Sequence, residues 1–95
     1  MKIGKIIKEI RTEKGISQGD LATACDISQA YLSQVENEVK MPSNALINVI
    51  GKELNVPTSV IFYLAIEESD VPQNKRGAYD QLSSTIASLV KSVYL

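Results

Sequence analysis

Residues 15–22, Gly-Ile-Ser-Gln-Gly-Asp-Leu-Ala, and residues 27–37, Ile-Ser-Gln-Ala-Tyr-Leu-Ser-Gln-Val-Glu-Asn, decide the fold of this chain. In each stretch a serine, Ser17 or Ser28, stands just before a helical run, where its hydroxyl can accept a hydrogen bond from a backbone N–H of the first turn. Two short capped helices joined by a tight turn are a helix-turn-helix. The second helix of such a pair can enter the major groove of DNA and present its N-terminal side chains to base edges.

Helical periodicity continues on both sides of this pair. Isoleucines at positions 3, 6, 7 and 10 predict an amphipathic helix over residues 3–14, which Gly15 ends. The two quoted stretches predict helices over about 18–25 and 29–37. Ser43 is placed to cap a fourth helix that runs to about residue 54, and a fifth extends from residue 57 or 58 to about 66. The residues of the fourth helix available for burial are Leu46, Ile47, Val49 and Ile50.

The polar residues 67–74 are expected to form a connector, and residues 75–94 a further helix. This last helix carries apolar side chains at alternating spacings of three and four, the pattern of a helix seam. Its members are Tyr79, Leu82, Ile86, Leu89 and Val93. Two interpretations remain open, because two to three heptads are too few to decide between them. The helix either folds back on its own domain or forms the contact of a homodimer, and we favour the dimer.

Composition excludes several classes of protein. A chain of 95 residues, 44% hydrophobic and 22% charged, is expected to form one domain with a single core. It has no histidine and a lone Cys25, so we expect neither a metal site nor a disulfide. No catalytic or cofactor-binding constellation is present, and an enzyme is not expected. The uncharged stretch 56–66 contains Pro57 and is too short to span a bilayer, and a signal peptide is absent, which predicts a cytoplasmic protein.

Two runs of residues, together with the order of five helices, carry a family resemblance. Arg11 is followed by Gly-Ile-Ser-Gln at 15–18 and Leu-Ala at 21–22, and Tyr-Leu-Ser at 31–33 is followed by Val-Glu-Asn at 35–37. Over about residues 3–66 the chain resembles the lambda-repressor-like (Cro/repressor, XRE-type) family. The resemblance implies an all-α, five-helix lambda-repressor-like DNA-binding domain over 1–66, followed by the connector 67–74 and an additional C-terminal helix over 75–95.

The resemblance also implies roles for individual residues. The base-reading surface would consist of Gln29, Ala30, Ser33 and Gln34. Glutamine can pair with adenine through two hydrogen bonds and an alanine methyl can contact that of thymine, so A·T pairs are expected at the positions read. Phosphate-contacting or positioning roles would fall to Ser17, Gln18, Ser28, Asn37, Lys40 and Lys14. Arg11 and Glu36 correspond to a pair that commonly forms a structural salt bridge in this family.

Three features depart from the family pattern. Asp26 replaces the usual glycine in the turn between the paired helices, although aspartate tolerates a left-handed conformation. Glu38 replaces a glycine after the recognition helix, where it is expected to strain the backbone and to place a carboxylate near the DNA phosphates. Residues 1–40 contain as many acidic as basic side chains, and the formal net charge of the chain is −1. Weak binding to random DNA is therefore expected.

Together these observations predict a sequence-specific DNA-binding transcription regulator, a dimeric repressor whose helix over 29–37 reads the major groove. Its partners would be double-stranded DNA with an inverted repeat and a second copy of the chain. The alternative is a protein-interaction or antitoxin-like module of the same fold, with weak or no autonomous DNA binding and a regulatory protein as its partner. Substitution of Gln29 and Gln34 distinguishes the two, since only the first function depends on them.

Overall fold

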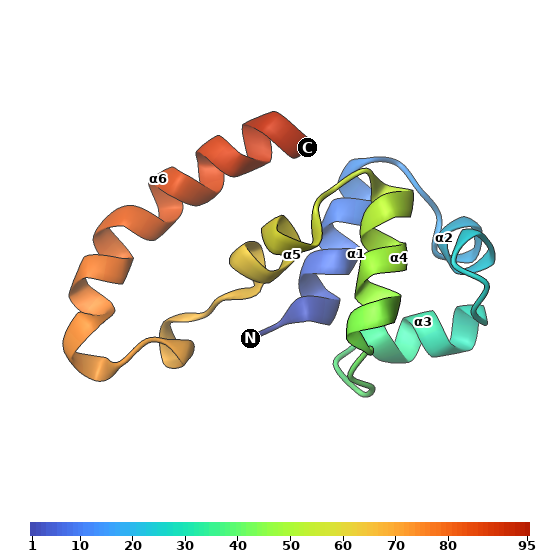
Figure 1. Ribbon diagram of the computed structural model, residues 1–95, viewed down its shortest axis with the longest axis horizontal. Helices are drawn as coiled ribbons and strands as arrows, with labels where there is room; N and C mark the ends of the chain where they lie inside the picture. Colours follow the sequence, from blue (N-terminus) through green and yellow to red (C-terminus); the bar gives the residue numbers. More distant parts are fainter.

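Helices form the whole of the computed structural model, which describes residues 1–95 (Figure 1). The elements are α1 (Ile3–Glu13), α2 (Gln18–Ala24), α3 (Gln29–Glu36), α4 (Asn44–Leu54), α5 (Thr58–Ala65), the 3-10 turns η1 (Glu68–Asp70) and η2 (Gln73–Lys75), and α6 (Arg76–Tyr94). The predicted all-α class is confirmed, and each α-helix begins and ends within one residue of its predicted limits. The connector expected at 67–74 is not irregular, because it contains η1 and most of η2. The side chain of Asp70 accepts a hydrogen bond from the backbone N–H of Glu67 at 2.8 Å, which closes η1.

Three serines begin helices as the sequence predicts. Ser17, Ser28 and Ser43 have extended backbones, and each Oγ accepts a hydrogen bond from the backbone N–H three residues further on. The distances are 3.0, 3.0 and 3.1 Å. Each bond satisfies one of the N–H groups that the first turn of a helix leaves without a partner, so these serines fix where α2, α3 and α4 start.

The first four helices all end in a left-handed residue, and only one of these residues is glycine. Gly15, Asp26, Glu38 and Asn55 have φ angles of 71°, 57°, 64° and 58°. In each case the next residue donates its N–H to a carbonyl near the end of the helix, at 2.8 to 3.0 Å, which is a Schellman-type closure. Aspartate and asparagine adopt this conformation with little strain, whereas a residue such as Glu38 costs about 1–2 kcal/mol. The expected strain at Glu38 is therefore present.

The carboxylate of Glu38 has a different place from the one expected near the phosphates. Its Oε1 accepts a hydrogen bond of 2.7 Å from the backbone N–H of Lys5, in the first turn of α1. The residue that precedes α1, Lys2, offers no capping side chain, so Glu38 supplies the missing acceptor from the end of α3. A negative charge at a helix N-terminus is also stabilised by the helix dipole. Glu38 thus links the start of α1 to the end of α3.

The core belongs entirely to the first five helices and the residues between them. It contains Ile3, Ile6, Ile7, Ile10, Leu21, Ala22, Cys25, Leu32, Val35, Ile47, Ile50, Leu54, Val56, Ile61 and Ala65. Val49, which the sequence offered for burial, is 41% exposed because α4 packs with the stripe that contains Ile47, Ile50 and Leu54. Burial raises the pKa of the Cys25 thiol, and the negative charge of Glu53 raises it further. This thiol is therefore a protonated core side chain.

A buried ion pair joins α1 to α3 within this core. Arg11 Nε donates to Glu36 Oε2 at 2.7 Å and Arg11 Nη2 donates to Glu36 Oε1 at 3.0 Å. Arg11 Nη1 donates to the carbonyl of Ile16 at 2.9 Å, so the same guanidinium also holds the chain that leads into α2. The side chains of Arg11 and Glu36 are 9% and 1% exposed. A paired charge in such a position is favourable only while its partner remains.

α6 stands apart from the five-helix domain along most of its length (Figure 1). It has no buried residue and packs mainly on η1 and η2. Four apolar side chains face solvent: Leu82, Ile86, Leu89 and Val93 are 58%, 39%, 63% and 73% exposed. Tyr79 lies differently, because its hydroxyl donates to the backbone carbonyl of Ile66 at 2.9 Å.

We expect Gly4→Ala to lower the free energy of unfolding by at least about 2 kcal/mol. A Cβ at Gly4 would lie 1.9 Å from the carbonyl oxygen of Val35 and 3.0 Å from Glu38 Oε1, so α1 would have to move away from α3. Gly77→Ala is the matched control, because nothing lies within 4 Å of a Cβ there. Thermal unfolding checks both variants, and equal stability of the two proteins would show that α1 and α3 do not meet at Gly4.

Arg11→Ala should lower the free energy of unfolding by about 3–5 kcal/mol, because it leaves the Glu36 carboxylate buried without a charged partner. The double variant Arg11→Met, Glu36→Leu removes both charges and should lose less stability than the single variant. Denaturant titration measures both. An Arg11→Ala protein with unchanged stability and weakened DNA binding would instead identify Arg11 as a DNA contact.

Candidate nucleic-acid interface

The polar side chains predicted to read bases lie together on the outer side of α3. Gln29, Ala30 and Gln34 are exposed and Ser33 is half-buried, whereas Leu32, Val35 and Glu36 face the core. Positions three and four residues apart share one face of a helix, so Ser33 lies next to both Gln29 and Ala30, and Gln34 lies next to Ala30, which joins the four side chains in one surface. α3 lies toward the end of the molecule away from α6 (Figure 1), and the exposure of Gln29, Ala30 and Gln34 leaves this surface open to solvent.

Gln18, the first residue of α2, connects this surface to the buried ion pair. Its Nε2 donates to Glu36 Oε1 at 3.0 Å, and its Oε1 accepts a hydrogen bond from Gln29 Nε2 at 3.4 Å. The side-chain oxygen and one amide hydrogen of Gln29 are then free to meet a base. Gln18 retains one amide hydrogen for a phosphate, so bracing of α3 and a phosphate contact are compatible.

Gly19 belongs to the same site, although no pattern in the sequence pointed to it. A Cβ at Gly19 would lie 3.3 Å from Gln29 Oε1, and Gln29 would have to shift to make room. The absent side chain therefore lets Gln29 lie across the start of α2. The approach of Gln29 to Gly19 depends on how α2 and α3 pack, which a linear pattern does not reveal.

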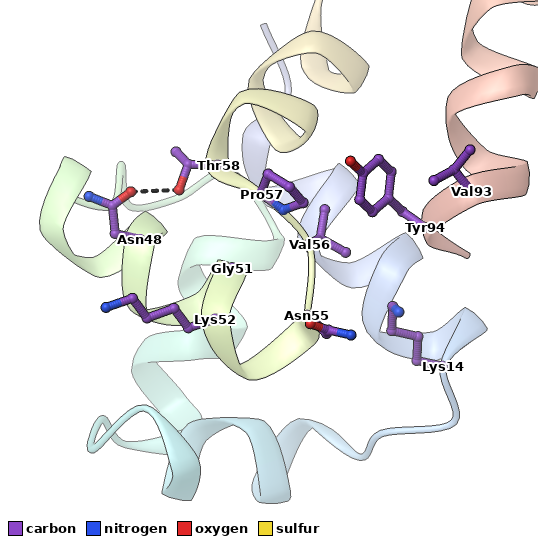
Figure 2. A pocket seen from close by; sticks show the side chains of 10 residues that line it. All are labelled: Lys14, Asn48, Gly51, Lys52, Asn55, Val56, Pro57, Thr58, Val93 and Tyr94. Carbon is purple, nitrogen blue, oxygen red and sulfur yellow. Dashed lines mark hydrogen bonds between the residues drawn. The ribbon is translucent and has the colours of Figure 1, made fainter.

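The residues predicted to contact phosphates occupy two regions. Ser17 and Ser28 cap α2 and α3, and Asn37 Nδ2 donates to Ser33 Oγ at 3.3 Å beside the reading surface. Lys40 is exposed in the segment after α3. Lys14 lies elsewhere: it borders a pocket at the C-terminal end of α1, together with Val93 and Tyr94 of α6 (Figure 2).

That pocket is also lined by polar residues from α4 and the start of α5. Its remaining members are Asn48, Gly51, Lys52, Asn55, Val56, Pro57 and Thr58. Thr58 Oγ1 donates to Asn48 Oδ1 at 2.5 Å across its rim (Figure 2). The lining contains no carboxylate and no pairing of a nucleophile with a base, and nowhere in the chain do three potential metal ligands cluster.

None of the helices is long and apolar enough to cross a membrane.

Electrostatically, the surface around α3 is close to neutral. The only ion pairs between side chains are Arg11 with Glu36 and Lys91 with Glu9, so Lys40 keeps its charge available. The Glu38 carboxylate, which follows α3, is bound to the N-terminus of α1 and is partly compensated there. Uncharged hydrogen-bond donors therefore dominate this surface.

Comparison with known proteins agrees with this geometry. The family described as Helix-turn-helix matches residues 7–61. The "ImmF control region 10 kDa protein" of Bacillus phage phi105 is 30% identical over 84 residues, which cover 88% of each chain. The "Immunity repressor protein" of the same phage is 31% identical over 61 residues, 64% of this chain and 42% of that protein.

One solved structure shares the fold. The clp gene regulator ClgR from Corynebacterium glutamicum superposes with a TM-score of 0.63 at 20% identity, over 97% of this chain and 86% of that chain. Both this superposition and the 84-residue alignment are too long for the five-helix domain alone, so they extend into α6. The family match, over residues 7–61, includes the Arg11–Glu36 ion pair, Gln18 with its hydrogen bonds to Glu36 and Gln29, and the exposed polar side of α3. The chain belongs to the lambda-repressor-like helix-turn-helix family, whose members are DNA-binding transcription regulators rather than enzymes.

Proposed function

We propose that this protein is a dimeric, site-specific repressor that reads an inverted repeat in double-stranded DNA with α3. One observation carries the proposal: Gln29, Ala30, Ser33 and Gln34 share the uncovered side of α3, while the opposite side is anchored by the Arg11–Glu36 pair. Repression is supported by a relative that is named an immunity repressor. A protein bound over a promoter blocks polymerase without needing an effector domain.

The chemistry of the reading surface favours A·T pairs. The free oxygen and amide hydrogen of Gln29 match the N6 and N7 groups of adenine, and Gln34 offers the same pair of groups. The Ala30 methyl can contact the methyl of thymine. Because the surface has no arginine to pair with guanine, its specificity comes from amide and methyl contacts.

Phosphate contacts are assigned to the residues that surround this surface. Gln18, Asn37 and Lys40 offer N–H donors, and Ser17 and Ser28 place the first turns of α2 and α3. We leave Lys14 out of this set because it borders the pocket beside α6. With so few cations, most of the affinity for random DNA is absent and the specificity ratio is high.

The dimer is assigned to the outer face of α6. Leu82, Ile86, Leu89 and Val93 repeat at alternating spacings of four and three, and all four are exposed, although Val93 also borders the pocket. Such a stripe is self-complementary when two copies of α6 meet, as in a helix seam. Tyr79, predicted as a fifth member, is left out because its hydroxyl is bound to the carbonyl of Ile66. Relatives that align into α6 support a shared role for this helix.

Replacing Gln29 and Gln34 by alanine should abolish selective binding without unfolding the protein. Each lost glutamine–adenine pair is worth about 1–3 kcal/mol of discrimination. The operator is first obtained by selection from random duplexes, and the affinities of both proteins for it are then measured. Gln81→Ala, at an exposed position of α6, is the matched control and should bind as the unchanged protein does. Full selectivity in the double variant would show that α3 does not read the bases.

Leu89→Lys should weaken the dimer about tenfold or more, because a charge replaces about 1.5–3 kcal/mol of apolar burial in each copy. Ser84→Lys adds the same charge at an exposed position outside the stripe and should leave the dimer intact. Sedimentation equilibrium gives the masses. A monomeric unchanged protein would contradict the dimer and favour the alternative, in which the stripe binds a regulatory protein.

A further inference from the structure

The C-terminal end of α6 returns to the five-helix domain at one small contact. Lys91 Nζ lies 3.0 Å from Glu9 Oε1 on α1, and it donates a hydrogen bond there across 82 residues of sequence. One helical turn later, Tyr94 packs against the edge of the core. We call these three residues, Glu9, Lys91 and Tyr94, the C-terminal contact. In Figure 1 the last turn of α6 points back toward α1, whereas the middle of the helix stands away from the domain.

Tyr94 forms the wall of a pocket at this contact. The pocket places its ring beside Val56 and Pro57, between the end of α4 and the start of α5, with Lys14 below (Figure 2). Tyr94 is half-buried, unlike its neighbour Val93, which is 73% exposed. Tyr94 thus packs against the domain, whereas Val93, at the rim of the same pocket, stays largely exposed and continues the outer stripe.

The N-terminal end of α6 is held separately. Tyr79 donates to the carbonyl of Ile66 at 2.9 Å, and Arg76 Nε donates to the carbonyl of Val71 at 3.1 Å. The helix spans about 28 Å at the usual rise per residue. Leu82, Ile86 and Leu89 lie between the two attachments and are exposed, and Val93 continues the stripe at the C-terminal attachment, beside the pocket. Two attachments fix the direction of a rod, whereas one attachment leaves it free to swing.

We propose that Glu9, Lys91 and Tyr94 are positioning residues that fix the angle of α6 against the five-helix domain, and so the half-site spacing that the dimer accepts. This inference rests on the proposed function, because it takes α6 as the seam and α3 as the reader. The two reading helices of a dimer are then joined through α6, the C-terminal contact and the core. Half-sites must lie about one helical turn apart for two such helices to enter successive major grooves.

The C-terminal contact is weak enough to be opened by single substitutions. Glu9 and Lys91 are 44% and 41% exposed, and an exposed ion pair shifts an equilibrium by up to about fivefold. Tyr94 adds the burial of part of an aromatic ring, which raises the effect of its loss to about tenfold. These changes are too small to unfold the five-helix domain, which has its own core. They are large enough to broaden the orientations of α6.

Spin-label distances test the angle without requiring DNA or a dimer. Labels are attached at Ala45→Cys on α4 and Ser84→Cys on α6, both exposed positions, and labelled protein is diluted with an excess of unlabelled protein. Cys25 stays unlabelled because it is buried. We expect one narrow distance distribution, which Tyr94→Ala broadens. A distribution that is already broad before the substitution, or one that Tyr94→Ala does not change, would overturn the proposal.

A charge exchange then tests the consequence for DNA. Lys91→Glu and Glu9→Lys each place like charges together, and the double exchange restores an opposite pair. Each single variant should keep the unfolding temperature and the dimer mass of the unchanged protein. It should also lose several-fold in its preference for the selected operator over one with half a helical turn inserted between the half-sites, and the double exchange should recover that preference. Lys75→Glu, an exposed residue of η2 without an ion-pair partner, is the control for net charge.

The outcomes separate the two proposals. Single variants that keep the full spacing preference, or a double exchange that fails to recover it, would overturn the positioning role while the repressor function stands. An unchanged protein that selects no operator or stays monomeric would contradict the proposed function. In that case the label distances still decide whether the C-terminal contact holds α6.

Discussion

The buried pair of Arg11 and Glu36 is the interaction on which the rest of the structure depends. The guanidinium of Arg11, on α1, contacts α3 through Glu36 and the segment that leads into α2 through the carbonyl of Ile16, so one planar group joins α1, α3 and this segment. Glu36 accepts a further bond from Gln18, and Gln18 in turn accepts one from Gln29. A hydrophobic pair of similar volume could stabilise the core as well, but it would not direct hydrogen bonds toward the reading surface. The pair therefore explains how a buried charge orients an exposed glutamine.

The end of α3 shows a second constraint, in which one residue is both strained and useful. A glycine at position 38 would relieve the left-handed strain, but it would leave the first turn of α1 without a side-chain acceptor. The charge-assisted bond from Lys5 to Glu38 offsets that strain, since such bonds contribute about as much as the conformation costs. Gly4 makes the arrangement possible by letting α1 come close to the carbonyl of Val35. The strained Glu38 at the end of α3 and Gly4 at the start of α1 thus together make the close contact between these two helices.

Local patterns predict what is local in this fold. The isoleucine spacing of α1 and the three serine caps place helices to within a residue, because hydrophobic periodicity and capping act over a single turn. Hydrophobic periodicity and capping patterns do not predict contacts between segments that are distant in the sequence. The hydrogen bond from the Lys5 backbone N–H to Glu38 joins residues 33 positions apart, and the space that Gly19 leaves for Gln29 depends on how α2 and α3 pack. The hydroxyl of Tyr79 donates to the backbone carbonyl of Ile66 in the same chain. The apolar spacing of α6 groups Tyr79 with the stripe residues. Only the path of the chain between α5 and α6 shows that the Tyr79 hydroxyl lies within hydrogen-bond distance of the Ile66 carbonyl.

The proposed reading helix α3 and the proposed dimer helix α6 lie at opposite ends of the molecule and are held with different strength. α3 is held by a buried ion pair and by core residues, so its position against α1 and α2 resists change. α6 is held by hydrogen bonds to Ile66 at the end of α5 and to Val71 in the connector, and by partly exposed contacts at its last turn, so small energies govern its direction. The proposed dimer would read two half-sites at once, so an error in the angle of α6 would displace its second reading helix by more than it displaces α6 itself. Under the proposed function, few cations are available to compensate for such a displacement by phosphate attraction, so the geometry of α6 would help to determine operator choice.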